Sequence, residues 1–67
     1  DLIIHENGVL YPIEIKLTTR PQAIMASEFD ILDGIPGKKR GMGAIICLTD
    51  RKIYLRENLV ALPISYL

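Results

Sequence analysis

The sequence predicts one small α/β domain in which a mixed sheet packs against one main helix. Three observations lead to this fold class. An Asn-Gly pair at 7–8 separates two apolar runs, which is the strongest short-range signal for a β-hairpin. A helical pattern then separates this hairpin from a continuous apolar run at 44–48, which is the order of a βαβ unit. Two short extended segments, joined by a turn, indicate a C-terminal β-hairpin.

The first predicted element is a hairpin spanning residues 1–16. A two-residue loop at Asn7-Gly8 sets the register, so that Glu6 pairs with Val9 and, further from the turn, Asp1 lies opposite Glu14. One face of the hairpin is then apolar and comprises Leu2, Ile4, Val9, Tyr11, Ile13 and Ile15. The other face comprises Asp1, Ile3, His5, Leu10, Pro12, Glu14 and Lys16, with His5 expected to be a surface histidine.

Asp1 and Glu14 are predicted to form a non-hydrogen-bonded pair, with Cα atoms about 4.5 Å apart. Carboxylates this close repel, unless a cation lies between their oxygens or one of them keeps its proton. Lys16 lies diagonal to the pair and relieves part of the repulsion. The pattern therefore outlines a site for a hard metal ion with a lysine beside it. The alternative is that Glu14 and Lys16 form a surface ion pair on a half-exposed strand.

The second predicted element is a helix over about residues 20–33. Thr19 is the expected N-cap, and Pro21 falls in the first turn, where its missing N–H costs little. Gly34 ends the helix. The apolar stripe expected to face the core comprises Ile24, Met25, Phe29, Ile31 and Leu32.

A glycine-rich basic loop follows at 37–43. In a functional interpretation, this loop contacts phosphate through Lys38, Lys39 and Arg40. In the alternative interpretation, it is a solvated connection. It is not a P-loop, because it lacks the Gly-Lys-Ser/Thr ending.

Three further strands are expected at about 43–48, 52–55 and 59–64. The first is typical of a strand covered on both faces and is expected to run parallel to the second strand of the hairpin. The second is expected to be antiparallel to the first. Pro63 in the third indicates an edge strand, because proline cannot donate a ladder hydrogen bond.

Composition excludes several classes of protein. Eight basic and eight acidic residues give a net charge of zero, without the electrostatic footprint of a dedicated nucleic-acid binder. Cys47 is the only cysteine, so a disulfide framework and a cysteine zinc site are excluded within the chain. No apolar run approaches ~18 residues and no signal peptide is recognisable. We therefore expect a soluble, cytoplasmic protein that is not bound to a membrane.

Size and the first strand predict self-association. The chain starts with Asp and not Met, so it is expected to be a piece of a longer protein. At 67 residues it can bury only about 60% of the surface that its unfolded chain exposes. The strand at 1–4 presents an open apolar edge, and such an edge recruits another strand.

An Asp followed about a dozen residues later by Glu-x-Lys resembles the PD-(D/E)xK restriction-endonuclease-like nucleases. More of the chain is similar to the uncharacterised C-terminal domain of a family of prokaryotic AAA-type ATPases. The segments that carry this similarity are Asp-Leu-Ile-Ile at 1–4, Tyr-Pro-Ile-Glu-Ile-Lys at 11–16, Pro-Gly-Lys-Lys at 36–39, Gly-Ala-Ile-Ile-Cys-Leu at 43–48 and Ala-Leu-Pro-Ile at 61–64.

The resemblance implies a truncated restriction-endonuclease-like core. It implies that Asp1 and Glu14 bind Mg²⁺ and that Lys16 orients or polarises the attacking water, with the backbone carbonyl of Ile15 as a further metal ligand. No organic cofactor is expected. Two functions follow: a binding or assembly module attached to an upstream ATPase module, or Mg²⁺-dependent hydrolysis of DNA or RNA. Enzymatic activity is left open, and the isolated chain is expected to cleave weakly or not at all.

Overall fold

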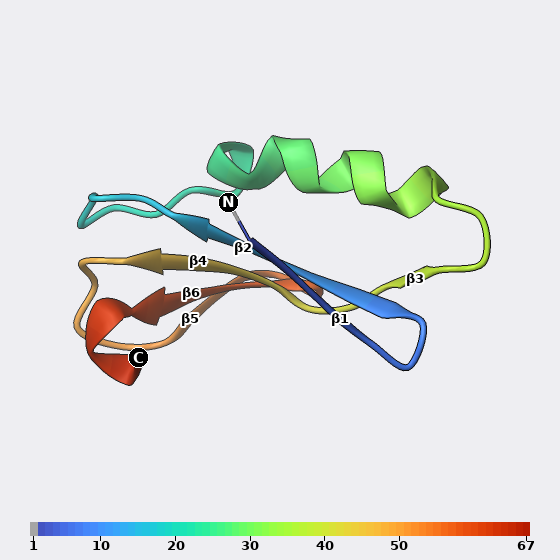
Figure 1. Ribbon diagram of the computed structural model, residues 1–67. Helices are drawn as coiled ribbons and strands as arrows, with labels where there is room; N and C mark the ends of the chain where they lie inside the picture. The colour runs from blue at the N-terminus through green and yellow to red at the C-terminus, as the bar shows by residue number, and fades with distance from the viewer. Residues whose placement is uncertain (1) are drawn as a thin grey trace.

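The structure, a computed structural model, describes residues 2–67 and consists of a six-stranded mixed sheet with one long helix lying across one face (Figure 1). The predicted mixed α/β class is confirmed. The elements are β1 Leu2–Glu6, β2 Val9–Ile15, η1 Ala23–Gly34, β3 Lys39–Arg40, β4 Gly43–Cys47, β5 Ile53–Arg56, β6 Leu59–Pro63 and η2 Ile64–Tyr66. The strand order is β1-β2-β4-β6-β5, and the short β3 pairs with β2.

The N-terminal hairpin forms as predicted. Asn7 and Gly8 have positive φ angles of 53° and 79°, as a type I′ turn requires. The register runs from Glu6 opposite Val9 to Leu2 opposite Ile13, which confirms the predicted pairing over the described residues. The predicted pairing of Asp1 with Glu14 lies outside them.

In the C-terminal half, one part of the predicted strand order is wrong. β2 and β4 are parallel, as predicted, and β5 and β6 form the predicted hairpin through the turn at 57–58. However, β6 lies between β4 and β5 and pairs parallel to β4, so β5 and β4 are not neighbours. Pro63 therefore belongs to an internal strand, and its interpretation as an edge residue was wrong. The strand ends at this residue, so the missing N–H interrupts no ladder beyond it.

The basic segment and the helix start also differ from the prediction. Lys39 and Arg40 are not in a loop but form β3, parallel to the start of β2. Thr19 does not cap the helix, because η1 begins at Ala23 with Gln22 as its N-cap and without a side-chain capping bond. The Thr18 carbonyl accepts a hydrogen bond of 2.8 Å from the Leu48 N–H. This bond keeps the chain alongside the sheet beyond the end of β2, so the helix begins later in the sequence than predicted.

The helix η1 is a 3₁₀ helix with a kink at Ala26, where φ is −112° and ψ is 21°, and its winding changes which side chains face the core. A 3₁₀ helix has three residues per turn, so residues at i and i+3 align. Ile24 and Ile31, expected in the apolar stripe, are 69% and 73% exposed. The aligned residues that are buried or half-buried against the sheet are Ala23, Ala26, Phe29 and Leu32. Together with Ile45, Cys47, Leu59 and Ala61 of β4 and β6, Ala26 and Phe29 form the core.

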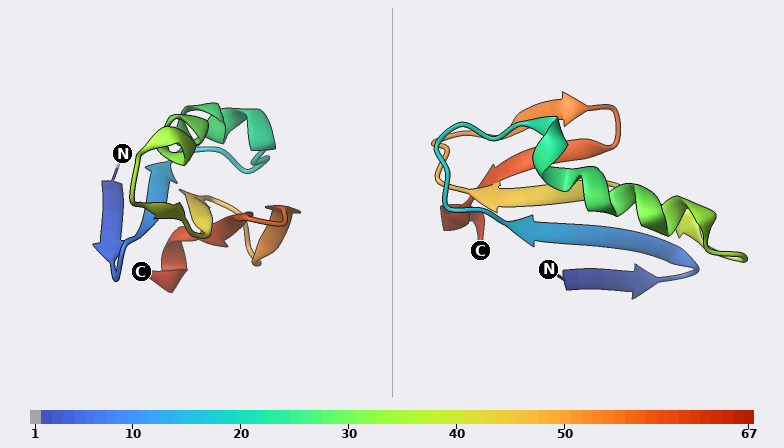
Figure 2. Two further views of the ribbon diagram at one scale, coloured as in Figure 1. Left: turned by 90° about the vertical axis from the view of Figure 1, so that its right-hand side faces the viewer. Right: turned by 90° about the horizontal axis from the view of Figure 1, so that it is seen from above.

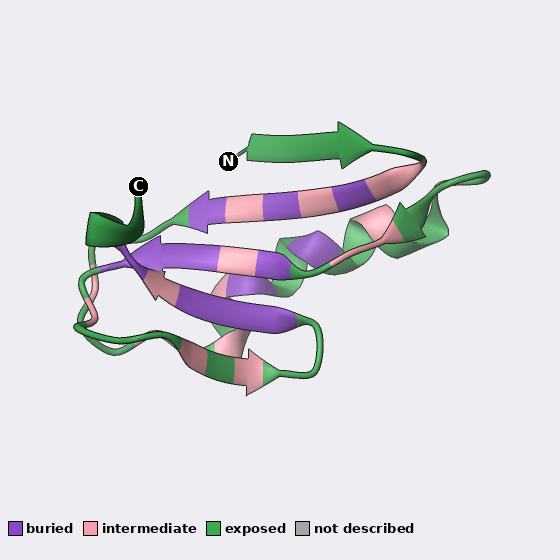
Figure 3. Cartoon of the chain, turned by 90° about the horizontal axis from the view of Figure 1, so that it is seen from below, coloured by how far each residue is buried: buried purple, intermediate pink, exposed green. Residues whose placement is uncertain are grey.

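The opposite face of the sheet lacks a comparable layer. Figure 2 shows η1 on one side and only the short η2 on the other, and Figure 3 looks onto that second side. We call it the open face. Strand alternation and the registers place on it the apolar residues Leu2, Ile4, Val9, Tyr11, Ile13, Ile15, Ala44, Ile46, Tyr54, Val60 and Leu62. No helix within residues 2–67 is long and apolar enough to cross a membrane.

Candidate functional site

Glu14 is a charged residue that the fold buries. It lies on the face of β2 that η1 covers, beside Ile45 of β4, and only 9% of it is exposed. Within residues 2–67 its carboxylate makes no hydrogen bond and no ion pair, including none to Lys16. No polar side-chain atom in that part of the chain is fully buried without a partner. The Glu14 carboxylate therefore keeps access to water, and the surface ion pair with Lys16 is not formed.

A cavity of about 120 Å³ lies between the hairpin and η1, and Glu14 is part of its wall. Glu28 of η1 brings a second carboxylate to the same cavity. The rest of the wall is mainly apolar and comprises Leu2, Ile3, Pro12, Ile13, Phe29 and Leu32. Glu28 is exposed, as expected for a helix residue that faces water, and it also lines the rim of this cavity.

The other predicted site residues are distributed around this cavity. Lys16 is exposed and is not in the cavity wall, although its N–H donates to the Ile46 carbonyl at 2.9 Å and continues the β2–β4 ladder. The side chain of Ile15 lies on the open face and is 54% exposed. Asp1 lies outside the described residues, so its convergence with Glu14 and Lys16 stays a prediction. Residues 2–67 contain no group of three or more acidic, histidine or cysteine side chains placed to hold a metal ion.

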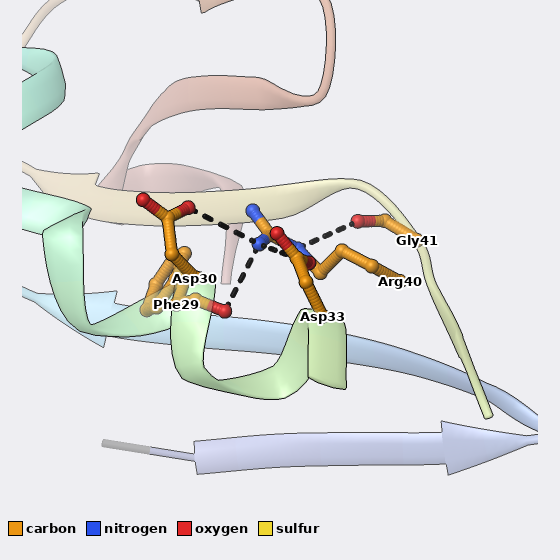
Figure 4. A network of polar contacts seen from close by, with 5 residues as sticks. All are labelled: Phe29, Asp30, Asp33, Arg40 and Gly41. Atoms are coloured by element: carbon orange, nitrogen blue, oxygen red, sulfur yellow. Dashed lines mark hydrogen bonds and ion pairs between the residues drawn. The ribbon is translucent and has the colours of Figure 1, made fainter. Parts of the chain in front are cut away.

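The three basic residues predicted to contact phosphate have different surroundings. Lys38 and Lys39 are exposed, and the Lys38 Nζ lies 3.0 Å from the His5 Nε2 at the turn end of the hairpin. Only 9% of the Arg40 side chain is exposed, because it lies between β3 and η1 (Figure 4).

The Arg40 guanidinium is held by the fold. Its Nη1 donates to the Phe29 carbonyl at 3.0 Å, and its Nε donates to the Gly41 carbonyl at 3.2 Å. The same Nη1 lies 3.4 Å from Asp33 and 3.9 Å from Asp30, and the guanidinium carbon is 5.5 Å from the centre of the Phe29 ring. This geometry favours a structural role for Arg40 and leaves two lysines at the surface for any phosphate contact.

Comparison of the chain with protein-family models, with curated proteins and with solved structures finds no match. The resemblance to restriction-endonuclease-like domains of AAA-type ATPases thus stays a prediction from the quoted segments.

Proposed function

We propose that this chain is a binding or assembly module, the C-terminal nuclease-like domain of a prokaryotic AAA-type ATPase. The open face of the sheet is the observation that carries the proposal. β2, β4 and β6 are parallel, and sheets built on parallel strands are normally covered on both faces. On the open face Leu2, Ile4 and Ile15 are 58%, 48% and 54% exposed. Ile46 and Val60 at the centre of this face are only 3% and 6% exposed, so the exposed apolar side chains lie toward its β1 side. Exposed apolar side chains grouped in this way favour an interaction site.

The dimensions of the molecule support the same proposal. Its accessible surface is 4680 Å², against about 4,250 Å² expected for a monomer of this mass. Its radius of gyration is 11.7 Å, against about 10.9 Å for a compact domain of this length. A two-layer plate that exposes one side of its sheet has these properties, and a second layer would remove the excess surface.

The resemblance supplies the partner, which is the ATPase module upstream in the parent chain. The test is a binding titration of the fluorescently labelled chain against that module. Ile15→Lys places a charge on the open face and is expected to weaken binding at least about tenfold, since it desolvates a charge in an apolar contact. Ile31→Lys, on the solvent side of η1, is the matched control. Equal affinities for the wild type and Ile15→Lys would contradict the proposal.

A second function, Mg²⁺-dependent hydrolysis of a phosphodiester, is favoured by the position of Glu14. A buried carboxylate that has no partner among residues 2–67, in a cavity reached by water, suits a hard cation. Asp1 and the Ile15 carbonyl are the further ligands that the resemblance implies. A divalent ion at this position would lower the pKa of its water and neutralise charge on the phosphate. Lys16 would orient that water.

The hydrolytic function is tested in two steps. Mn²⁺ binding to the chain, followed by calorimetry, is expected to be lost in Glu14→Gln, which keeps the shape of the side chain. Cleavage of single- and double-stranded DNA and RNA is then measured for the wild type and Lys16→Ala. Unchanged Mn²⁺ binding in Glu14→Gln would rule out this site.

A further inference from the structure

The outer edge of β1 presents backbone groups in a pattern that is fixed by the hairpin. In an antiparallel pair, residues alternate between those that exchange hydrogen bonds with the partner strand and those that do not. The turn makes Glu6 and Val9 a hydrogen-bonded pair, so Ile4 and Leu2 also bond to β2. The N–H and C=O groups of Ile3 and His5 point away from β2. β1 is the last strand of the sheet, and these groups have no bonding partner within residues 2–67.

The two edges of the sheet are protected to different degrees. At the β5 edge the ladder is irregular between Tyr54 and Arg56, and charged Arg56 lies in the strand itself. Bulges and positive charges are devices that keep an edge from pairing with another strand. β1 carries one charged residue, Glu6, at its turn end, but it has neither a lysine nor a proline nor a bulge, and all five of its residues are exposed. The β1 edge is therefore the one of the two that is better suited to pair with a further β-strand.

We infer that the occupant of this edge is β1 of a second copy, paired antiparallel across a two-fold axis at Ile4. Ile3 and His5 flank Ile4 symmetrically, so this arrangement places Ile3 of each copy opposite His5 of the other. Both outward-pointing residues then exchange their N–H and C=O bonds. Ile4 meets its own copy in the closer kind of pair, with Cα atoms about 4.5 Å apart.

The side chains agree with this register. Leu2 of one copy lies opposite Glu6 of the other, and His5 lies opposite Ile3, so no two like charges face each other. A two-fold axis at His5 would instead place the two imidazoles opposite each other, which is unfavourable when they are protonated. The self-complementarity of β1 about Ile4 is the reason for proposing a second copy and not an unrelated strand. The inference rests on the proposed assembly role, but it uses the edge of the sheet and not the open face.

Disulfide cross-linking tests the register. The Ile4→Cys variant is expected to form a covalent dimer under mild oxidation, because its Cα atoms lie within the distance that a disulfide spans. Ile3→Cys is the matched control, because its two Cα atoms are about 8 Å apart in this register and cannot be bridged. The wild type, whose Cys47 is buried, is expected to stay unlinked. Efficient linking of Ile3→Cys, or none of Ile4→Cys, would overturn the inference.

Sedimentation tests pairing at the β1 edge separately from association through the open face. Ile3→Pro removes an outward N–H without touching the bonds to β2, whereas Ile3→Val keeps that N–H. The wild type and Ile3→Val are expected to dimerise at micromolar concentration, and Ile3→Pro to be a monomer with an unchanged circular dichroism spectrum.

The outcomes separate the two proposals. A dimer that survives Ile3→Pro but dissociates in Ile15→Lys would overturn edge pairing and leave the assembly role standing. A monomeric wild type whose binding to the ATPase module is lost in Ile3→Pro would assign the edge to a strand of that module, which also overturns the second-copy inference. Edge dimerisation without any binding to the ATPase module would support the inference and contradict that part of the proposed function.

Discussion

Arg40 joins the helix to the sheet through a single side chain. It stands on β3, and its guanidinium contacts a backbone carbonyl and a ring of η1 as well as the Gly41 carbonyl beside it. Its partners Asp30 and Asp33 are 67% and 53% exposed, so solvent weakens those two ion pairs. The bonds to the two partly buried carbonyls are expected to contribute more than the ion pairs, because solvent competes with them less.

Replacement of Arg40 by methionine is expected to lower the free energy of unfolding by about 2–3 kcal/mol. Methionine keeps much of the aliphatic volume but removes the hydrogen bonds that the guanidinium donates to the Phe29 and Gly41 carbonyls. Lys39→Met, at the neighbouring exposed position, is the control and is expected to change stability by less than about 0.5 kcal/mol. Urea denaturation followed by circular dichroism measures both. Equal effects of the two substitutions would show that Arg40 is a surface cation.

Gly41, which follows β3, passes so close to Val9 and Tyr11 on the open face that no room is left for a Cβ. A Cβ at this position would lie 2.8 Å from the Val9 Cγ1 and would also overlap the Tyr11 ring. Gly41→Ala is therefore expected to destabilise the fold by about 1–3 kcal/mol. Gly34→Ala is the control, because nothing lies within 4 Å of its added Cβ. Thermal melting of the two variants tests this, and a Gly41→Ala protein as stable as the Gly34→Ala protein would contradict it.

At the scale of the elements, the winding of η1 decides which of its residues are structural. In a regular α-helix Ile31 and Leu32 would both border the predicted apolar stripe. In the 3₁₀ helix Leu32 aligns with Phe29 and forms part of the cavity wall, while Ile31 is 73% exposed. The exposed Glu28 of the same helix lines the cavity that contains Glu14.

Two alanine substitutions that remove the same number of carbon atoms test this winding. Leu32→Ala is expected to lower the free energy of unfolding by about 1–2 kcal/mol, below the range for fully buried leucines because the residue is only half-buried. Ile31→Ala is expected to change the free energy of unfolding by less than about 0.5 kcal/mol, since the Ile31 side chain is exposed and its truncation leaves no cavity. Chemical denaturation measures both, and a comparable loss at the two positions would indicate an α-helical stripe.

At the scale of the whole molecule, the proposed assembly is expected to raise the stability of the fold. The plate measures 36 × 22 × 19 Å and has one open face and one unprotected edge. A partner that binds only the folded state raises the apparent stability by mass action. The melting temperature of the wild type is therefore expected to rise with chain concentration, while that of Ile3→Pro stays constant. A concentration-independent melting temperature of the wild type would contradict edge pairing in solution.

Much of the fold could be predicted because its signals are local. The type I′ turn at Asn7-Gly8 sets the register of β1 and β2 through the allowed φ angles of two adjacent residues. The parallel pairing of β2 with β4 follows from the helix between them. The position of β6 between β4 and β5 could not be predicted, because a short connection allows a strand to pair with either neighbour in the chain and only the packing under η1 selects one.

The sequence by itself determined five of the six strands, the turn at Asn7-Gly8, the apolar face of the hairpin and the placement of Glu14 in the second strand. These depend on backbone conformations and side-chain alternation, which are properties of neighbouring residues. Only the tertiary structure decided that Glu14 is buried in the wall of a cavity, that Arg40 binds η1 and that Ile24 and Ile31 face solvent. Those outcomes depend on the start and the winding of η1, which are set by contacts with a sheet whose residues lie far away in the sequence.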